Sequence, residues 1–450
     1  MKLTQVVPYD PKIIQPENIR DQDVEIPNEE DPVQAEKLKM LVNAQRRFQE
    51  FMNILYNRQG QELKYYVSFY GFGGVLLGIL TNLLTTLLPM RDPIENPAFL
   101  TDLWPTKLVV GPILATANNL LLFRYLTNTR CLSTMKHFGL ALLLIILIGT
   151  FVIALMSGVW VKILGYSPPL PFQQSIGGST SVLFQTMSLL SIIPNQWRQN
   201  KDFRRRYKFF LGNTLLITLM YNEYVALGLL FVAVPDEYQW ILAILLPFVR
   251  ELNSWIQEKL GHKAAGANDT SVTIVAAHVV NTRHCVFLCA VIGNTTTNAS
   301  SSIILGADFI YNLYLALKIV WIKKMKCNSE RNDQKMFELL LTLTINELVE
   351  VVVPLTYLVC FLSAYYGPNA EIIGGVKSTH FHYEPVTNIY GFIENIMLFM
   401  MVDIVSVIFV GSTLWVSCKI NLIRAYMTIL KEFWPIITLT TAYSIYAVMI

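Results

Sequence analysis

The segment Ala277–Gly293, AHVVNTRHCVFLCAVIG, places His278, Asn281, Arg283 and His284 inside an otherwise apolar stretch. A charged side chain at the centre of a bilayer costs about 2.5–3.5 kcal/mol on insertion scales, and therefore usually faces other helices or water rather than lipid. The segment indicates a membrane helix whose polar side has partners inside the protein.

The same pattern recurs in the neighbouring apolar segments, such as Leu245–Trp255, LLPFVRELNSW. Asp308 and Asn312 are four residues apart and share a helix face, and the same spacing relates Asn346 to Glu350. We interpret these intramembrane polar residues as a candidate transport path. The full set is Glu223, Arg250, Glu251, His278, Asn281, Arg283, His284, Asp308, Asn312, Asn346, Glu347, Glu350 and Asp403.

The set contains six carboxylates but only two arginines, Arg250 and Arg283. Three explanations are open: some acids are neutral, they line a hydrated path, or a cation completes the charge balance. Each suits the passage of protons or metal cations. We expect Glu347, Glu350 and Asp308 to lie on the path, with Arg283 as their counter-charge. The alternative is a structural hydrogen-bond network that fixes the register of the helices.

The composition describes a membrane protein rather than a soluble one. Of the 450 residues, 53% are hydrophobic and only 15% are charged. The formal net charge of +3 is too small to give the strong positive potential that attracts nucleic acid, so we expect no nucleic-acid partner. None of the six cysteines forms a CxxC pair, which argues against a zinc site or a disulfide framework.

Apolar segments of about the 20 residues that a spanning helix needs recur along the chain. The fold class predicted from them is an all-α integral membrane protein, a polytopic bundle of about ten spans. A shorter C-terminal hydrophobic segment, Phe433–Ile450, contains Pro435, and the sequence leaves open whether it spans. The ten segments are 65–88, 107–125, 138–163, 173–193, 207–234, 239–256, 272–293, 300–322, 336–366 and 388–418.

Composition divides the chain into four regions. Residues 1–64 are polar and indicate a cytosolic tail followed by an amphipathic helix, and residues 65–194 hold the first, mostly apolar spans. Residues 207–419 form the bundle with the polar core, and residues 431–450 form a short hydrophobic helix. No apolar signal-peptide region lies near Met1.

Lysines and arginines in the loops between the apolar segments predict how the chain is oriented across the membrane. The loop Asn195–Lys208 carries six lysines and arginines, whereas Gly165–Phe172 carries none. If all ten segments cross, the basic loops share one side, which is cytosolic by the positive-inside rule and includes the N-terminus. The sequons at Asn294 and Asn298 then lie outside, and the one at Asn268 lies inside. We expect a multi-pass protein of the plasma membrane or another secretory-pathway membrane.

The predicted function is a membrane transporter or channel for ions or a small solute, with proton or cation coupling through buried acids. Its partners are the lipid bilayer and the transported ion or small molecule; the sequence leaves homo-oligomers open. We predict no cofactor and no catalytic residues, because the chain has no P-loop, GxSxG or HExxH motif. Two alternatives stay open: an intramembrane enzyme with a His/Glu site, and a multi-span receptor that couples through the basic loop.

Overall fold

Helices make up all the regular secondary structure that the computed structural model describes. The described residues are 111–127, 138–164, 179–265, 270–294, 298–324, 330–368 and 388–449, together with Leu80. All of them belong to one compact unit, Arg47–Ile450. The predicted N-terminal tail and amphipathic helix, residues 1–64, lie outside the described residues, and so does the first predicted span apart from Leu80.

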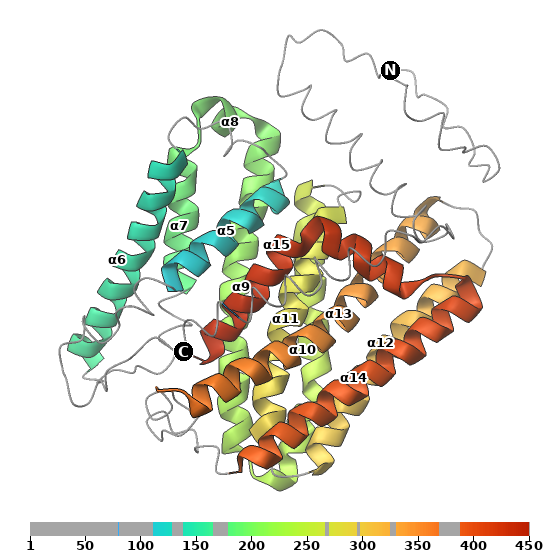
Figure 1. The fold of residues 1–450 in the computed structure, drawn as a ribbon. Coiled ribbons are helices and arrows are strands. Elements are labelled where there is room, and N and C mark those ends of the chain that lie inside the picture. The colour runs from blue at the N-terminus through green and yellow to red at the C-terminus, as the bar shows by residue number, and fades with distance from the viewer. Residues whose placement is uncertain are drawn as a thin grey trace, which may run out of the picture. The chain divides into compact units, whose positions relative to one another are not determined.

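Each later predicted segment overlaps a helix, so the all-helical prediction is confirmed for the described residues (Figure 1). The helices are α5 (Gly111–Thr127), α6 (Phe138–Leu164), α7 (Ser179–Ile192), α8 (Asn195–Gln199), α9 (Lys201–Ala233), α10 (Gln239–Ala265), α11 (Thr270–Asn294), α12 (Asn298–Lys324), α13 (Glu330–Tyr366), α14 (Ile389–Cys418) and α15 (Leu422–Met449), with a 3-10 turn, η6 (Asp236–Tyr238), before α10. Asn294 and Asn298 lie at the facing ends of α11 and α12, and Asn268 lies outside the described residues.

The C-terminal helix differs from the prediction. We expected a short helix within residues 431–450, but α15 begins at Leu422 and runs for 28 residues, with Pro435 inside it. The start of the helix was missed in the sequence because Arg424 and Lys431 interrupt its apolar pattern.

Three described helices contain stretches long and apolar enough to cross a membrane: Ser301–Lys324, Lys335–Tyr366 and Ile389–Cys418. They belong to α12, α13 and α14, and α14 packs against both of the others. α11 is the central helix, since it packs against α5, α9, α10, α13, α14 and α15. The residues of the candidate path therefore lie on helices that contact one another.

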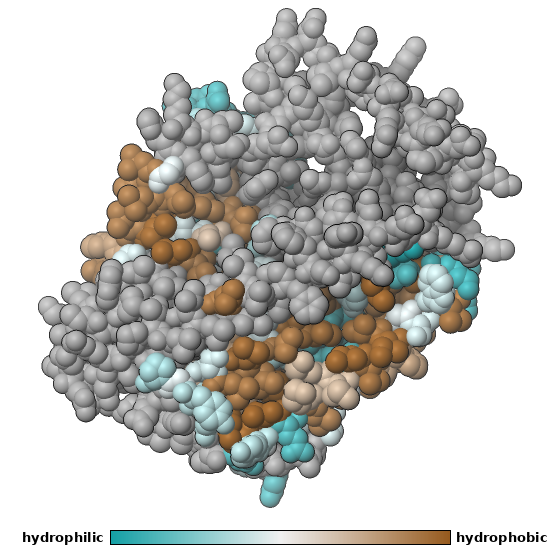
Figure 2. All heavy atoms as spheres, viewed as in Figure 1, coloured by the Kyte–Doolittle hydropathy of each residue, from teal (hydrophilic) through white to brown (hydrophobic). Residues whose placement is uncertain are grey.

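Large apolar side chains are exposed along the outer faces of several helices. On α6 they include Leu140, Leu147 and Phe151, and on α14 they include Met401 and Ile408. Figure 2 shows hydrophobic surface where α6 and α14 lie in Figure 1. Exposed apolar side chains gathered on one face mark a site of contact with a membrane or with another protein.

α6 and α7 approach closely at Gly149. A Cβ atom on this residue would overlap the side-chain amide of Gln185 and would lie 2.9 Å from Ser181 Oγ. Gln185 Nε2 also donates a buried hydrogen bond to Thr116 Oγ1 of α5 (2.9 Å). The small residue thus lets three helices interlock.

We therefore predict that Gly149→Ala lowers the free energy of unfolding by about 1–3 kcal/mol, the usual cost of overpacking. Gly139 lies on the same helix, and a Cβ atom added to it would meet nothing within 4 Å among the described residues. Gly139→Ala is therefore the matched control and should be neutral or slightly stabilising. Unfolding of the purified chain in detergent measures both. Equal stability of the two variants would contradict the close approach.

Candidate functional site

Arg250 of α10 bonds to three other helices through its guanidinium group. Its Nε donates to Asn281 Oδ1 of α11 (2.7 Å), its Nη1 donates to Asp308 Oδ1 of α12, and its Nη2 donates to Glu350 Oε1 of α13 (3.0 Å). The guanidinium carbon also lies 5.0 Å from the centre of the Tyr311 ring. The planar fork of arginine suits such divided contacts, and here it joins α10 to α11, α12 and α13 at one point.

Amide side chains extend this centre through α11, α12 and α13. Asn312 Nδ2 donates to Glu350 Oε2 (2.6 Å), and the side-chain amides of Asn281 and Asn346 hydrogen-bond to each other. The terminal amide group of Asn346 also lies 3.5 Å from Asn312 Oδ1. The four-residue spacing from Asn346 to Glu350 places both on the side of α13 that faces α11 and α12.

α14 contributes Asp403 and Ser406 from its buried face. Ser406 Oγ donates to Glu347 Oε1 of α13 (3.1 Å). Asp403, Asp308 and Glu350 each offer a carboxylate oxygen, and these oxygens lie within 4.8 Å of one another. Acids from three helices therefore meet beside the guanidinium of Arg250.

We call this group the Arg250 cluster: Arg250, Asn281, Asp308, Asn312, Asn346, Glu347, Glu350 and Asp403. Its residues are between 0% and 6% exposed. The cluster sets four carboxylates against one guanidinium. Within the described part of the chain, Asp308 Oδ2, Glu347 Oε2 and Asp403 Oδ2 have no hydrogen-bond partner. Burying a charge is costly unless it is paired and hydrogen-bonded, so the cluster has acceptor capacity left for a cation or a donor group.

Two predicted acids lie apart from the cluster. Glu223 of α9 is half-buried and accepts a hydrogen bond from Asn253 Nδ2 (3.0 Å). Glu251 is exposed and accepts one from the hydroxyl of Tyr311. Since Tyr311 also lies under the guanidinium of Arg250, Glu251 is linked to the cluster through this ring.

The two predicted histidines make separate contacts. His278 Nε2 lies 3.2 Å from the backbone oxygen of Ile437 in α15, and His284 Nδ1 lies 3.3 Å from the hydroxyl of Tyr224 in α9. Both imidazoles are buried. They connect α11 to α15 and α9.

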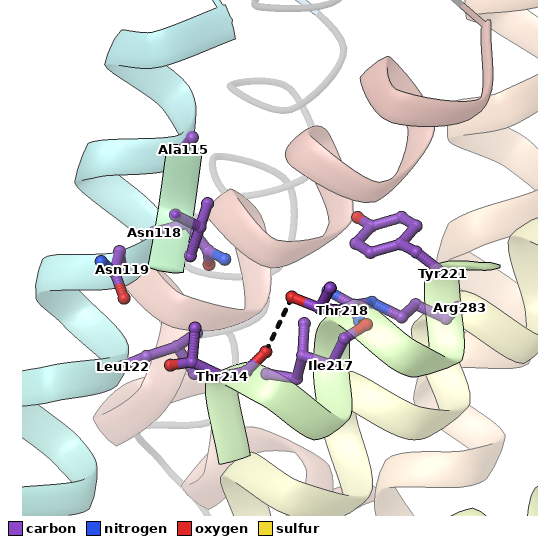
Figure 3. A pocket seen from close by; sticks show the side chains of 10 residues that line it. Ala115, Asn118, Asn119, Leu122, Thr214, Ile217, Thr218, Tyr221 and Arg283 are labelled. Atoms are coloured by element: carbon purple, nitrogen blue, oxygen red, sulfur yellow. Dashed lines mark hydrogen bonds between the residues drawn. The ribbon is translucent and has the colours of Figure 1, made fainter. Parts of the chain in front are cut away.

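Arg283 lies in a small pocket between α5, α7, α9 and α11 (Figure 3). Its Nη1 donates to the backbone oxygen of Ile217 (2.7 Å), and its guanidinium carbon lies 3.8 Å from the centre of the Tyr221 ring. Figure 3 shows Arg283 and Tyr221 side by side at one end of the pocket, with Asn118 and Asn119 of α5 toward the other.

We expected Arg283 to be the counter-charge of the acids, but the guanidinium that bonds to Asp308 and Glu350 is that of Arg250. The reason is the helical period. Arg283 follows Asn281 by two residues, which turns it about 200° around α11. Asn281 faces the acids, so Arg283 faces α9.

Two cluster neighbours were not among the predicted residues. Tyr311 precedes Asn312 and supplies the ring beneath Arg250. Ser406 follows Asp403 by three residues and supplies the hydrogen bond to Glu347. Their spacing to a predicted residue was the available signal, but a serine or tyrosine in a membrane helix is too common to be selected on its own.

No protein-family model, curated protein or solved structure matches this chain. The functional argument therefore depends on the geometry and charge of the cluster.

Proposed function

We propose that this chain is a multi-pass membrane protein of about ten spans, with its N-terminus in the cytosol, that transports ions or a small solute. The observation that carries the proposal is the excess of buried carboxylates around Arg250, three of whose oxygens lack hydrogen-bond partners among the described residues. Proton or cation coupling through these acids accounts for their retention, because ionisable residues inside membrane helices are functional by default.

The surroundings of the cluster support this proposal. The helices that carry the acids, α12, α13 and α14, are those with stretches long and apolar enough to cross a membrane. Large apolar side chains on α14 face outward, while Asp403 and Ser406 face inward. The acids are thus sheltered together within the helices rather than spread over the apolar surface.

The strongest competitor is a purely structural network. A structural network satisfies its members, since a half-satisfied buried network is less favourable than an apolar core. The contacts of Arg250, Asn281 and Asn312 fit that description. Asp403 does not, because no described residue hydrogen-bonds to its Oδ2. The enzyme alternative is less favoured because His278 and His284 lie against α15 and α9 instead of beside Glu347.

Flux measurements test the proposal. The full chain reconstituted into liposomes should pass protons or cations faster than protein-free liposomes do. Glu347→Gln keeps the side-chain volume and an acceptor for Ser406 but removes the charge. We expect it to lower flux by about 10-fold or more, since an interaction with a charged group contributes about 1.5–3 kcal/mol.

Glu394→Gln is the matched control, because Glu394 is an exposed acid of α14 outside the cluster. It should leave flux unchanged. Wild-type flux equal to that of protein-free liposomes would overturn transport. Unaltered flux in Glu347→Gln would remove Glu347 from the path. Ligand-dependent signalling without flux would favour a receptor.

A further inference from the structure

Asp403 is a buried acid with an oxygen that the described part of the fold does not use. The residue is 3% exposed, it lies on the buried face of α14, and its Oδ2 has no hydrogen-bond partner there. Asp308 resembles it in part, since Oδ1 accepts from Arg250 but Oδ2 has no partner among the same residues. Carboxylate oxygens held this way lower the stability of a fold unless a ligand engages them.

The carboxylates of Asp308, Glu350 and Asp403 have the spacing of a cation site. Asp308, Glu350 and Asp403 each place one oxygen within 4.8 Å of the other two. Oxygens on opposite sides of a Ca²⁺ ion, each at about 2.3–2.6 Å, lie about 4.6–5.2 Å apart, so three oxygens this close fit around one ion. Glu350 already accepts from Arg250 and Asn312, but a carboxylate has about four lone-pair sites and keeps capacity for a metal ion.

The net charge of the site and its ligand atoms indicate which kind of ion it would bind. Carboxylates bind a metal ion in their deprotonated form, so with an ion bound the three carry −3 and Arg250 supplies +1, which leaves −2 among these four groups. A divalent cation neutralises that charge, whereas a monovalent ion does not. The three ligands offer oxygen alone, without thiolate or imidazole, and such sites suit hard cations such as Ca²⁺, Mg²⁺ and Mn²⁺.

We infer that Asp308, Glu350 and Asp403 form a binding site for a hard divalent cation, joining α12, α13 and α14. Binding follows from the cluster alone. The further step, that such a cation is the transported substrate, rests on the proposed function. Arg250 contacts two of the three ligands and orients them, so it acts as a positioning residue.

Direct titration of the purified full chain in detergent tests the site. CaCl₂, MgCl₂ and MnCl₂ are titrated separately, with binding heat and the thermal unfolding temperature as readouts, and NaCl at equal ionic strength as the reference. Wild type and Glu394→Gln should bind at least one divalent ion and unfold at a higher temperature with it.

Asp403→Asn is the informative variant, because asparagine keeps the shape of the side chain and removes one ligand charge. It should bind the same ion at least about 10-fold more weakly, since a contact to a charged group is lost. Without divalent ions it should unfold at or above the wild-type temperature, which a purely structural role for Asp403 would not produce.

Three outcomes would overturn the inference: no response of wild type to any of the three ions, an equal response to NaCl, or unchanged binding by Asp403→Asn. The flux measurement tests the proposed function independently of this binding test. Divalent binding without flux in liposomes leaves the site standing and removes transport, whereas flux without divalent binding does the reverse.

Discussion

Arg250→Met is expected to destabilise the fold by about 3–5 kcal/mol, the usual cost of removing one partner from a buried ion pair. The substitution keeps a long apolar stem but removes the donors to Asn281, Asp308 and Glu350. Two carboxylates on α12 and α13 would then lie buried without their cation. Unfolding of the purified chain in detergent measures the loss.

A neutral version of the same centre provides the control. The triple variant Arg250→Met, Asp308→Asn, Glu350→Gln removes the guanidinium together with both of its carboxylate partners. Replacing a buried ion group as a whole is often neutral or stabilising, so this variant should recover most of the lost stability. A single Arg250→Met variant as stable as wild type would mean that the guanidinium does not bridge these helices.

Glu350→Gln is expected to lower ion flux by about 100-fold, as the loss of two interactions with charged groups at about 1.5 kcal/mol each. Glu350 bonds to Arg250 and Asn312, and one of its oxygens lies within 4.8 Å of those of Asp308 and Asp403. Among the acids of the cluster, Glu350 therefore hydrogen-bonds to the guanidinium and to an amide, and it also places an oxygen within 4.8 Å of the other two candidate ligands.

The measurement compares initial flux in liposomes at matched protein density. Glu394→Gln, an exposed acid on α14, is the reference for an acid-to-amide change outside the cluster. Glu350→Gln should keep a measurable unfolding transition, because glutamine still accepts and donates hydrogen bonds. Flux within about twofold of wild type would contradict the proposal, since it would show no role for this charge beyond packing.

Most described helices, and the eight polar residues of the Arg250 cluster, were among those predicted from the sequence, although five other predicted residues lie outside the cluster. Hydrophobic length located nearly every described helix, and the four-residue spacing of Asp308 to Asn312 placed both on one face. The position of a helix and the residues that share one of its faces depend on spacing along the chain, so they can be predicted from the sequence. The excess of acids over arginines was visible in the same way.

The contacts between side chains on different helices were not predictable from the sequence. Whether Arg250 or Arg283 contacts the acids depends on how α11 is rotated against α9, α10 and α13, and packing sets that rotation. The extra length of α15 was missed because Arg424 and Lys431 break its apolar pattern. Ser406 joined the centre through a hydrogen bond to Glu347 on another helix, a contact that spacing along one helix does not reveal.

Flux through the triple neutral variant is the most direct test of the central claim, because it separates the role of the charges from their effect on the fold. Arg250→Met, Asp308→Asn, Glu350→Gln should reconstitute as a folded protein and pass ions no faster than protein-free liposomes. If this folded variant transported ions at the wild-type rate, the buried charges around Arg250 would be structural and the proposed path would be wrong.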